Sequence, residues 1–152
     1  MPRIALFPGS FDPFTKGHED IVRRGLHLFD EIIIGIGRNA SKQRYFTLEQ
    51  MTAWIEGTFY NEPAVRVVSY DDLTANVARD MGARFLLRGL RNTTDFEYEN
   101  GISQVNRFVY QEVETVFLIT SPHVAPISSS IIRDLHRYGQ SVDAFLPYAL
   151  EE

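Results

Sequence analysis

The chain of 152 residues contains no cysteine, which excludes disulfide bonds, thiolate metal sites and a cysteine nucleophile. It also lacks an apolar run of 18 residues, so we expect no membrane span. The first residues enter a strand pattern at once and show no signal-peptide pattern. These absences predict a cytoplasmic protein that does not bind membranes.

Lysine is scarce, since only Lys16 and Lys42 occur, and arginine supplies almost all of the positive charge. The formal net charge of -5 at pH 7 argues against broad nucleic-acid binding, which relies on a basic surface. Arginine suits planar, two-pronged contacts with phosphate oxygens. An acidic chain can therefore still contain a local phosphate pocket.

The length and the apolar content of 44% suit a single domain over residues 1–152. Five nearly continuous apolar segments are expected as strands buried on both faces, at 3–8, 31–37, 65–70, 84–88 and 114–120. Helical patterns alternate with them at 17–29, 47–60, 73–81, 95–111 and from Ser128 to Tyr138. The alternation predicts an α/β fold, a doubly wound five-stranded parallel sheet with right-handed crossovers.

Local chemistry marks several of the expected helix ends. Thr47 and Gln50 form a capping box, and Asp95 is expected to cap the helix that follows it. Gly82 is expected at a helix C-cap. Gly101 lies inside a helical pattern, where it weakens the helix and favours a bend.

Ligands of open parallel sheets bind beyond the carboxyl ends of the strands. The segments that follow the expected strands are 9–18, 38–46, 71–74, 88–99 and 120–130, and we expect them to converge. They contain nearly all of the side chains suited to binding phosphate.

The first motif runs from Gly9 to His18 and joins a strand to a helix. Gly9 permits a tight turn and a close approach of backbone to ligand. A helix N-terminus carries unpaired N–H groups and partial positive charge, so phosphate binds there, and His18 can donate a hydrogen bond to it. The alternative is an ordinary strand–turn–helix segment with capping residues, in which the histidine makes its hydrogen bonds within the protein and binds no ligand. The whole segment favours a nucleotide site.

The second motif runs from Arg88 to Glu99, directly after the fourth strand. Arg88 and Arg91 are three residues apart and could reach one phosphate group, while the carboxylates downstream could pair with them or contact a ribose or adenine edge. An exposed ion-pair network is the alternative, and such pairs contribute little stability.

Two further segments complete the set of candidates. Residues 128–130 are three serines that suit a helix N-cap, and their N–H and hydroxyl groups could also bind phosphate together with Arg133. Lys42 lies in the loop after the second strand, where a lone lysine is usually solvated. Asp71 and Asp72 read best as a surface turn.

These motifs carry a family resemblance over essentially the whole chain. Residues 9–13, followed by Gly17-His18, resemble the phosphate-binding motif of the nucleotidyltransferase superfamily. The string from Arg88 to Glu99 resembles phosphopantetheine adenylyltransferases in particular. Ser10 replaces a frequent threonine and keeps its hydroxyl. Val124-Ala125-Pro126 replaces a segment that often carries an aromatic residue, so aromatic stacking on adenine from position 124 is not expected.

The resemblance implies a Rossmann-like nucleotidyltransferase fold and transfer of an adenylyl group from ATP to 4′-phosphopantetheine, which gives dephospho-CoA and pyrophosphate. It implies Mg²⁺ bound through the ATP phosphates, a homohexamer, and inhibition by coenzyme A. Asp12 is a weak candidate for an outer contact. We expect no nucleic-acid partner.

The same resemblance assigns roles to individual residues. The catalytic group comprises His18 and Lys42 on the α-phosphate, Ser10 on the attacking phosphate, and Arg91. The nucleotide-binding group comprises Ser10, Phe11, His18, Gly89, Arg91, Glu99, Val124, Ile127, Ser128, Ser129 and Ser130. The substrate-binding group comprises Ser10, Lys42, Thr74 and Arg88.

Two alternatives stay open at this point. An adenylyltransferase of the same superfamily acting on nicotinate mononucleotide would share the phosphate motif, and the string from Arg88 to Glu99 favours pantetheine over it. A non-catalytic sensor of nucleotide or coenzyme A would keep the fold, but such a protein would usually lose His18 or Lys42, and both are present.

Overall fold

Strands and helices alternate along the chain in a computed structural model that describes residues 1–39 and 41–150. The strands are β1 (Ile4–Gly9), β2 (Glu31–Gly37), β3 (Val65–Tyr70), β4 (Phe85–Leu90) and β5 (Glu114–Ile119). The helices are α1 (Lys16–Gly25), α2 (Leu48–Thr58), α3 (Thr74–Asp80), α4 (Thr93–Val109), α5 (Ser129–Arg137) and the short 3-10 helix η1 (Asp143–Phe145). Each predicted strand and helix is therefore confirmed within a few residues.

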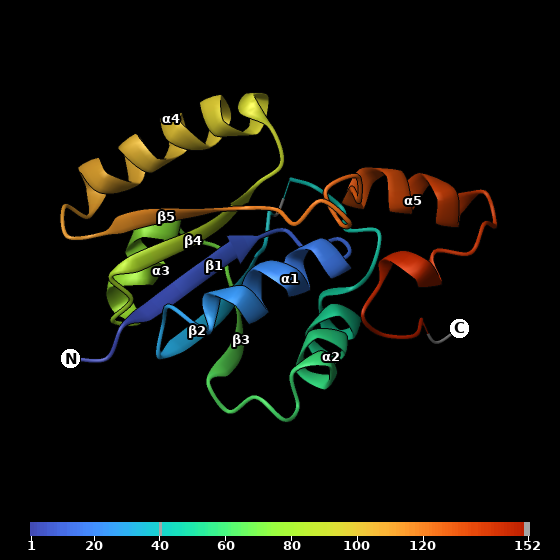
Figure 1. Cartoon of the computed structure of the whole chain (residues 1–152), viewed down its shortest axis with the longest axis horizontal. Helices are drawn as coiled ribbons and strands as arrows, with labels where there is room; N and C mark the ends of the chain where they lie inside the picture. Colours follow the sequence, from blue (N-terminus) through green and yellow to red (C-terminus); the bar gives the residue numbers. More distant parts are fainter. Residues whose placement is uncertain (40, 151–152) are drawn as a thin grey trace.

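The five strands form one parallel sheet in the order β3-β2-β1-β4-β5, as Figure 1 shows. The chain builds outward from β1 to β3 and then returns to the other side of β1, so the switch point lies between β1 and β4. These two strands pair only through Ala5↔Phe85 and Leu6↔Leu86. Beyond that point β1 and β4 are not paired, and this opens a crevice at their carboxyl ends.

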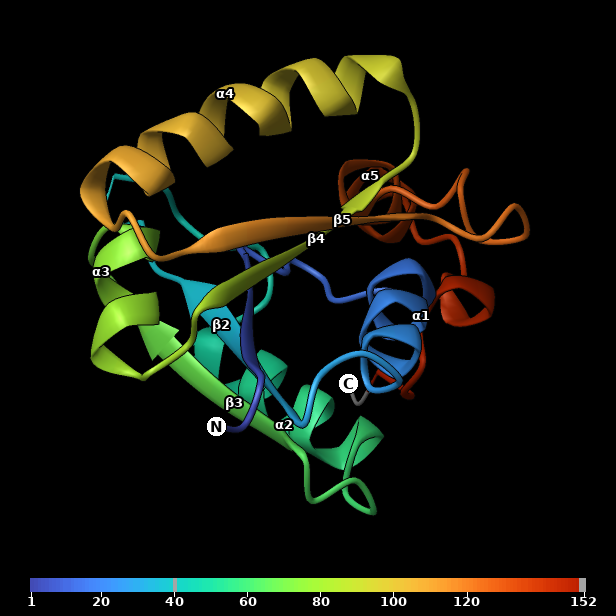
Figure 2. The ribbon, with the colours of Figure 1, turned by 60° about the vertical axis from the view of Figure 1, so that its left-hand side comes forward.

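Helices cover both faces of the sheet (Figure 2). On one face, α1 and α2 bury Ile21, Val22, Met51 and Ile55 against the strands. On the other face, α3 packs Val77 and Ala78 against the sheet, as part of a separate core cluster. This arrangement confirms the doubly wound fold.

Two expectations about burial and capping were wrong. The outer strands β3 and β5 are only partly buried, because each pairs with a neighbour on one side and its outward residues meet solvent. Asp95 does not cap α4: Asn92 is the N-cap, and its side chain accepts from the Asp95 N–H. The helix starts there because Asn92 is extended while Thr93 is already helical.

Other boundaries are as predicted. Thr47 and Gln50 form both halves of the capping box that starts α2. Gly82 follows the end of α3 with a φ of +73°, a left-handed conformation that favours glycine. Helix α4 continues through Gly101 without interruption.

Among the described residues, no helix has the length and apolar character needed to cross a bilayer.

Candidate active site

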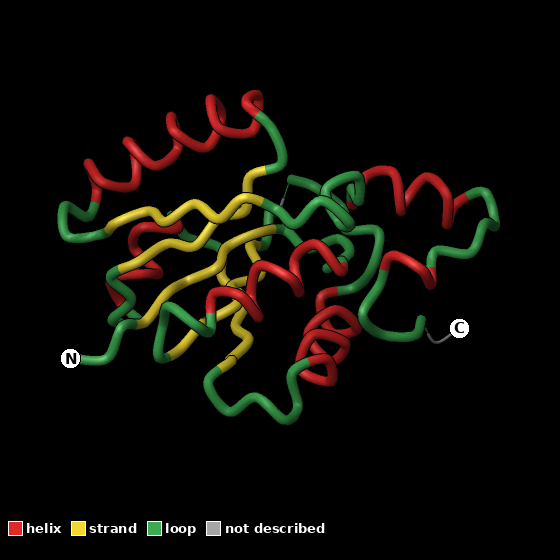
Figure 3. The backbone as a smooth tube through the Cα atoms, in the orientation of Figure 1, coloured by secondary structure: helices red, strands yellow, loops and turns green. Residues whose placement is uncertain are grey.

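The loops after the strands gather at the carboxyl edge of the sheet (Figure 3), and they enclose two neighbouring cavities. The first cavity, of about 410 Å³, lies between the segments after β1, β4 and β5. It is lined by every residue that the sequence assigned to nucleotide binding, namely Ser10, Phe11, His18, Gly89, Arg91, Glu99, Val124, Ile127, Ser128, Ser129 and Ser130. The convergence predicted from the strand order is confirmed for these segments.

The second cavity, of about 750 Å³, extends from the same edge toward β2, β3 and α4. Ser10, Arg88 and Thr74, all predicted as substrate-binding residues, line it. Five residues line both cavities: Pro8, Gly9, Ser10, Arg88 and Glu99. Two ligands occupying the cavities would therefore meet beside Ser10 and Arg88.

His18 lies in the first turn of α1, and its position follows from the helix cap. Thr15 is the N-cap, and its hydroxyl accepts from the N–H groups of Gly17 and His18. The Thr15 N–H donates in return to Nδ1 of His18 at 2.9 Å. Because Nδ1 is thereby an acceptor, the proton of the neutral imidazole resides on Nε2, which remains available as a donor.

The surroundings of His18 keep the ring neutral. The ring packs against Phe7, Phe11 and Phe14, with centroid distances of 5.0–6.2 Å. Burial, supported by the positive charges of Arg88 and Arg91, lowers the pKa of His18 from 6.5 to about 3. At neutral pH His18 is therefore an uncharged hydrogen-bond donor rather than a cation.

Donors from other parts of the chain bind backbone carbonyl groups at the end of β1 and in the loop between β1 and α1. In chain order the bonds are Pro8 with Arg88, Ser10 and Phe11 with Arg44, Asp12 with Arg133, Pro13 with the Ser129 hydroxyl, and Phe14 with the Tyr148 hydroxyl. Carbonyl oxygens repel phosphate, and here cationic or hydroxyl donors occupy them. The loop is thus pre-organised for an anion.

Gly9 is required by close packing in this loop. Phe11 adopts a φ of +47°, which turns its ring back over β1. A Cβ at Gly9 would lie 2.8 Å from Cζ of that ring. A side chain at position 9 would displace Phe11 from the wall of the first cavity, because both atoms could not keep their places.

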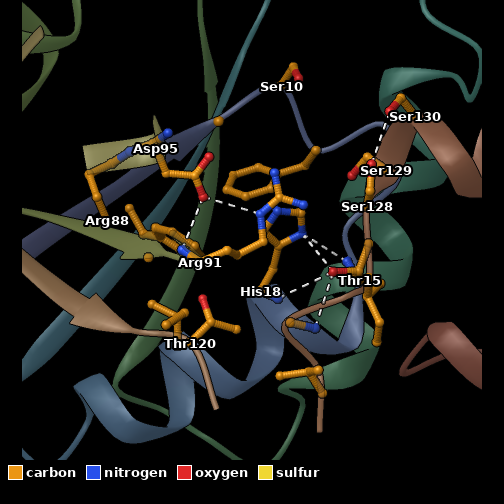
Figure 4. A pocket seen from close by; sticks show the side chains of 18 of the residues that line it. Ser10, Thr15, His18, Arg88, Arg91, Asp95, Thr120, Ser128, Ser129 and Ser130 are labelled. Carbon is orange, nitrogen blue, oxygen red and sulfur yellow. Dashed lines mark hydrogen bonds and ion pairs between the residues drawn. The ribbon is translucent and has the colours of Figure 1, made fainter. Parts of the chain in front are cut away.

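The two arginines of the second motif are paired with carboxylates, which is one of the two alternatives that the sequence left open. Arg88 donates to Glu99 through Nε at 2.9 Å and through Nη2 at 2.6 Å. Arg91 donates to Asp95 through Nε at 3.2 Å. Figure 4 shows Arg91 and Asp95 beside His18 on one wall of the first cavity. The Glu99 carboxylate is thus engaged by Arg88 before any ligand binds.

The start of α5 forms the opposite wall (Figure 4). Ser128 is the N-cap residue, but its side chain makes no capping hydrogen bond and instead contacts the Ser130 hydroxyl at 2.9 Å. The expectation that the serines provide the N-cap is confirmed in position by Ser128, although its hydroxyl makes no capping hydrogen bond. Ser129 is bound to the Pro13 carbonyl, which joins α5 to the loop after β1. The N-terminal turn of α5 lines the cavity, and the backbone N–H groups at a helix N-terminus suit phosphate oxygens.

Lys42 and Asp12 lie apart from this wall. Lys42 is exposed, and it is not one of the described residues that line the two cavities. The Asp12 carboxylate accepts from the N–H groups of Tyr45 and Phe46 at 2.8 Å and 2.9 Å. It thus holds the loop that carries Lys42.

Several lining residues were not singled out from the sequence. In the first cavity these include Thr15, Thr120 and, as a ligand contact, Asp95; in the second they include Tyr70, Tyr98, Ile102 and Asn106. Thr120 directly follows β5, so the rule on strand ends could have found it. The α4 residues recur at a spacing of four, and no sequence signal distinguishes that face from an ordinary amphipathic helix.

The second cavity has a polar floor. The Tyr70 hydroxyl contacts the Thr74 hydroxyl at 3.1 Å, and burial raises the pKa of Tyr70 above its ordinary value. Asp71 and Asp72 lie at the rim, where Asp71 pairs with Arg38 and Asp72 accepts from the Leu73 N–H. These contacts fit the surface turn predicted for the two aspartates.

The carboxylates near the site do not form a metal-binding set. Among residues 1–39 and 41–150, no three His, Asp or Glu side chains are grouped closely enough to hold a metal ion. The two carboxylates that line the first cavity, Asp95 and Glu99, are both paired with arginine. A divalent cation at this site would need oxygen ligands from a bound phosphate.

Comparison with known proteins places this geometry in a family. The cytidylyltransferase-like family model matches residues 6–135. The phosphopantetheine adenylyltransferase of Cytophaga hutchinsonii is 59% identical over 150 residues, covering 99% of this chain and 100% of that protein. The protein of the same name from Flavobacterium johnsoniae is 51% identical over 148 residues, covering 97% of each.

Solved structures confirm the fold at much lower identity. A bifunctional NMN adenylyltransferase/ADP ribose pyrophosphatase from Francisella tularensis aligns with a TM-score of 0.73 at 17% identity, covering 97% of this chain and 45% of that one. The same protein complexed with AMP and a manganese ion gives a TM-score of 0.69, covering 99% and 46%. This chain spans less than half the length of those structures, and the likeness supports the fold alone. The full-length identity to curated relatives decides the family: the chain belongs to the phosphopantetheine adenylyltransferases, within the cytidylyltransferase-like nucleotidyltransferases.

Proposed function

We propose that this protein transfers the adenylyl group of ATP to 4′-phosphopantetheine, giving dephospho-CoA and pyrophosphate. The observation that carries the proposal is the pair of cavities that meet at Ser10 and Arg88. One cavity suits a nucleotide with its phosphates, and the other suits a longer, partly apolar ligand that ends in a phosphate. The domain that holds both cavities is taken to span residues 1–152.

The reaction is an in-line displacement at the α-phosphorus of ATP. An oxygen of the 4′-phosphate forms the new P–O bond, and the bond from the α-phosphorus to the bridging oxygen of pyrophosphate breaks. The attacking phosphate monoester is already anionic, so no strong general base is needed. Catalysis then consists of positioning both phosphates and stabilising the charge that develops between them.

The residues of the first cavity would divide this work. Nε2–H of His18 donates to an α-phosphate oxygen, a role that suits a neutral ring fixed by Thr15. Arg91 and residues 128–130 bind the ATP phosphates. Phe11, Gly89, Val124 and Ile127 contact the nucleotide, and Glu99 contacts its nucleoside while it remains paired with Arg88.

The residues of the second cavity and its rim would hold the acceptor. The Ser10 hydroxyl orients the attacking phosphate, Arg88 binds it, and Thr74 contacts the pantetheine arm. Lys42 reaches the α-phosphate from the loop after β2, which requires its long side chain to extend into the space beside Ser10 when ATP binds.

Magnesium would arrive with the nucleotide. The carboxylates of the first cavity are paired with arginine, so the ion would be held mainly through phosphate oxygens of the nucleotide. Bound there, Mg²⁺ supplies positive charge to the departing pyrophosphate.

We also propose that the protein assembles as a homohexamer in the cytoplasm and is inhibited by coenzyme A. Self-association is supported by α4, all of whose 17 residues are described and none of which is buried. Val105 and Phe108 of this helix are 62% and 86% exposed. Apolar faces of this kind are usually covered by a partner.

The test is pyrophosphate release with ATP, Mg²⁺ and 4′-phosphopantetheine, measured beside the same assay with nicotinate mononucleotide as acceptor. Release with phosphopantetheine alone is the expected result. Release with the mononucleotide alone would keep the fold and the phosphate site but overturn the assignment of the second cavity. ATP binding without release in either assay would indicate a nucleotide sensor.

A further inference from the structure

Arg44 fixes the loop after β2 to the loop after β1. Its Nη1 donates to the Ser10 carbonyl at 2.6 Å, its Nη2 donates to the Phe11 carbonyl at 2.8 Å, and its Nε donates to the Phe46 carbonyl at 3.0 Å. The side chain is only 18% exposed. A guanidinium has a rigid fork of donors, so these three bonds define its position and that of both loops.

A second link runs in the opposite direction. Asp12 accepts from the N–H groups of Tyr45 and Phe46, while Nη2 of Arg44 lies 3.8 Å from its carboxylate. One side chain from each loop, Arg44 or Asp12, therefore binds the backbone of the other loop. Such reciprocal bonding resists sliding of one loop along the other, because any shift breaks bonds of both kinds.

A third link joins the same loop to the helix that forms the far wall of the first cavity. The Tyr45 hydroxyl lies 2.6 Å from Nδ1 of His136 in α5, and the guanidinium of Arg137 lies 5.3 Å from the centre of the Tyr45 ring. Residues 44–46 are thereby held on two sides.

Lys42 lies only two residues before Arg44, a span of at most about 7 Å along an extended chain. Its position along the cavity rim is therefore limited by the anchor at residue 44, while its own side chain is exposed. The ammonium has a long and flexible stem, so a fixed attachment point reduces the number of conformations that must be lost when it contacts a phosphate.

We propose that Arg44 is a positioning residue for adenylyl transfer: it holds the backbone of the Lys42 loop against Ser10 and Phe11, so that Lys42 reaches the α-phosphate. The assignment of Lys42 to that phosphate rests on the proposed function. Arg44 itself is not one of the described residues that line either cavity.

The kinetic test compares Arg44→Met, which keeps the aliphatic stem, with the matched control Arg66→Met, which removes only an exposed pair with Glu31. We expect Arg44→Met to lower kcat on the order of 10- to 100-fold, the scale of a misplaced catalytic group, with the KM for ATP within about threefold. The same substitution in a Lys42→Ala background should change kcat by less than about threefold, because both changes remove one function. Equal losses in the two backgrounds, or a kcat for Arg44→Met within about twofold of wild type, would overturn the proposal.

A second measurement does not depend on activity. Because Lys16 and Lys42 are the two lysines of the chain, a lysine-specific endoprotease reports directly on the loop. We expect Arg44→Met to raise the rate of cleavage after Lys42 at least about fivefold, with the Lys16 bond in α1 and the Arg66→Met control unchanged. An unchanged rate after Lys42 would contradict the anchor even if wild-type protein released no pyrophosphate.

If Arg44→Met does not fold, two milder variants carry the same test. Arg44→Lys keeps the charge but cannot reach three carbonyl groups, and Tyr45→Phe removes only the hydroxyl that contacts His136. Both should raise the cleavage rate after Lys42 by less than Arg44→Met would, and lower kcat in proportion. Wild-type values for both variants would refute the anchor.

Discussion

Arg88 and Glu99 form a two-pronged ion pair, at 2.9 Å and 2.6 Å, at the junction of the two cavities. The remaining Nη1 of Arg88 bonds the Pro8 carbonyl of β1. Arg88 therefore has a fixed orientation, and it also bridges the crevice where β1 and β4 are no longer paired. A cation held in this way keeps its place when a phosphate arrives, and this reduces the reorganisation needed for binding.

Arg88→Ala should raise the KM for 4′-phosphopantetheine about 10- to 100-fold, since a hydrogen bond to a charged group contributes about 1.5–3 kcal/mol. The KM for ATP should change much less, because Arg91 and residues 128–130 are still present. Initial rates with each substrate varied separately provide the measurement. Weaker ATP binding with an unchanged KM for the acceptor would move Arg88 to the nucleotide side.

His18→Ala should lower kcat at least ~10²-fold, the scale of one lost transition-state donor. His18→Gln is the informative companion, because an amide can accept from the Thr15 N–H and still offer an N–H to the cavity. Its kcat should fall between those of wild type and His18→Ala. Single-turnover rates of adenylyl transfer check this order, and a near wild-type rate for His18→Ala would remove the assignment.

The fold could be predicted from the sequence because its strands carry their own signal. β1 and β2 are nearly continuous in apolar residues and are buried as expected. The alternation of strands with helices was enough to predict a parallel sheet. The outer strands β3 and β5 were also expected to be buried on both faces but are less buried, since strand order and the coverage of edges depend on tertiary packing.

The candidate site was predictable where residues follow a strand end, and less so where side chains bind backbone. The nucleotide group was found because its members cluster in three segments at one edge of the sheet. Arg44 was missed, because its contacts depend on where the loop after β1 lies. Asp95 was misassigned as a helix cap, because Asn92 caps α4 three residues earlier. Composition carries no information on such pairings.

Lys42→Ala should lower kcat by about 10²-fold with little change in stability, because the residue is exposed and removing one charge stabiliser costs on this scale. Lys16→Ala is the matched control, since it removes the other lysine of the chain and should leave kcat unchanged. Pyrophosphate release by the two variants, at saturating ATP and acceptor, distinguishes them. Equal rates would show that Lys42 is only a solvated loop residue.

Phe108→Asp should dissociate the assembly without unfolding the subunit. Phe108 is 86% exposed in one chain, so a charge there costs the isolated subunit little, but it would be buried in an interface on the face of α4. Tyr60→Asp is the control, because Tyr60 is 84% exposed near the end of α2 on the other face of the sheet. Light scattering after gel filtration should give a smaller particle for Phe108→Asp only. A wild-type protein that elutes as a monomer would refute self-association.

The neutral state of His18 makes folding sensitive to acid. The folded chain holds the pKa of His18 at about 3 through burial and the charges of Arg88 and Arg91, whereas an exposed histidine has a pKa of 6.5. Between these values the unfolded chain binds a proton that the folded chain does not, so stability is fully present above 6.5 and is lost as the pH falls.

His18→Gln removes this dependence, because glutamine does not titrate. Urea unfolding of both proteins from about pH 7.5 to about pH 4.5 should show the free energy of unfolding of wild type falling faster than that of the variant, by up to about 1.4 kcal/mol per pH unit. Every other titrating group is common to the two proteins, so the difference isolates position 18. A constant difference across the range would mean that His18 titrates normally in the folded chain, and with it the neutral-donor role in the first cavity would fail.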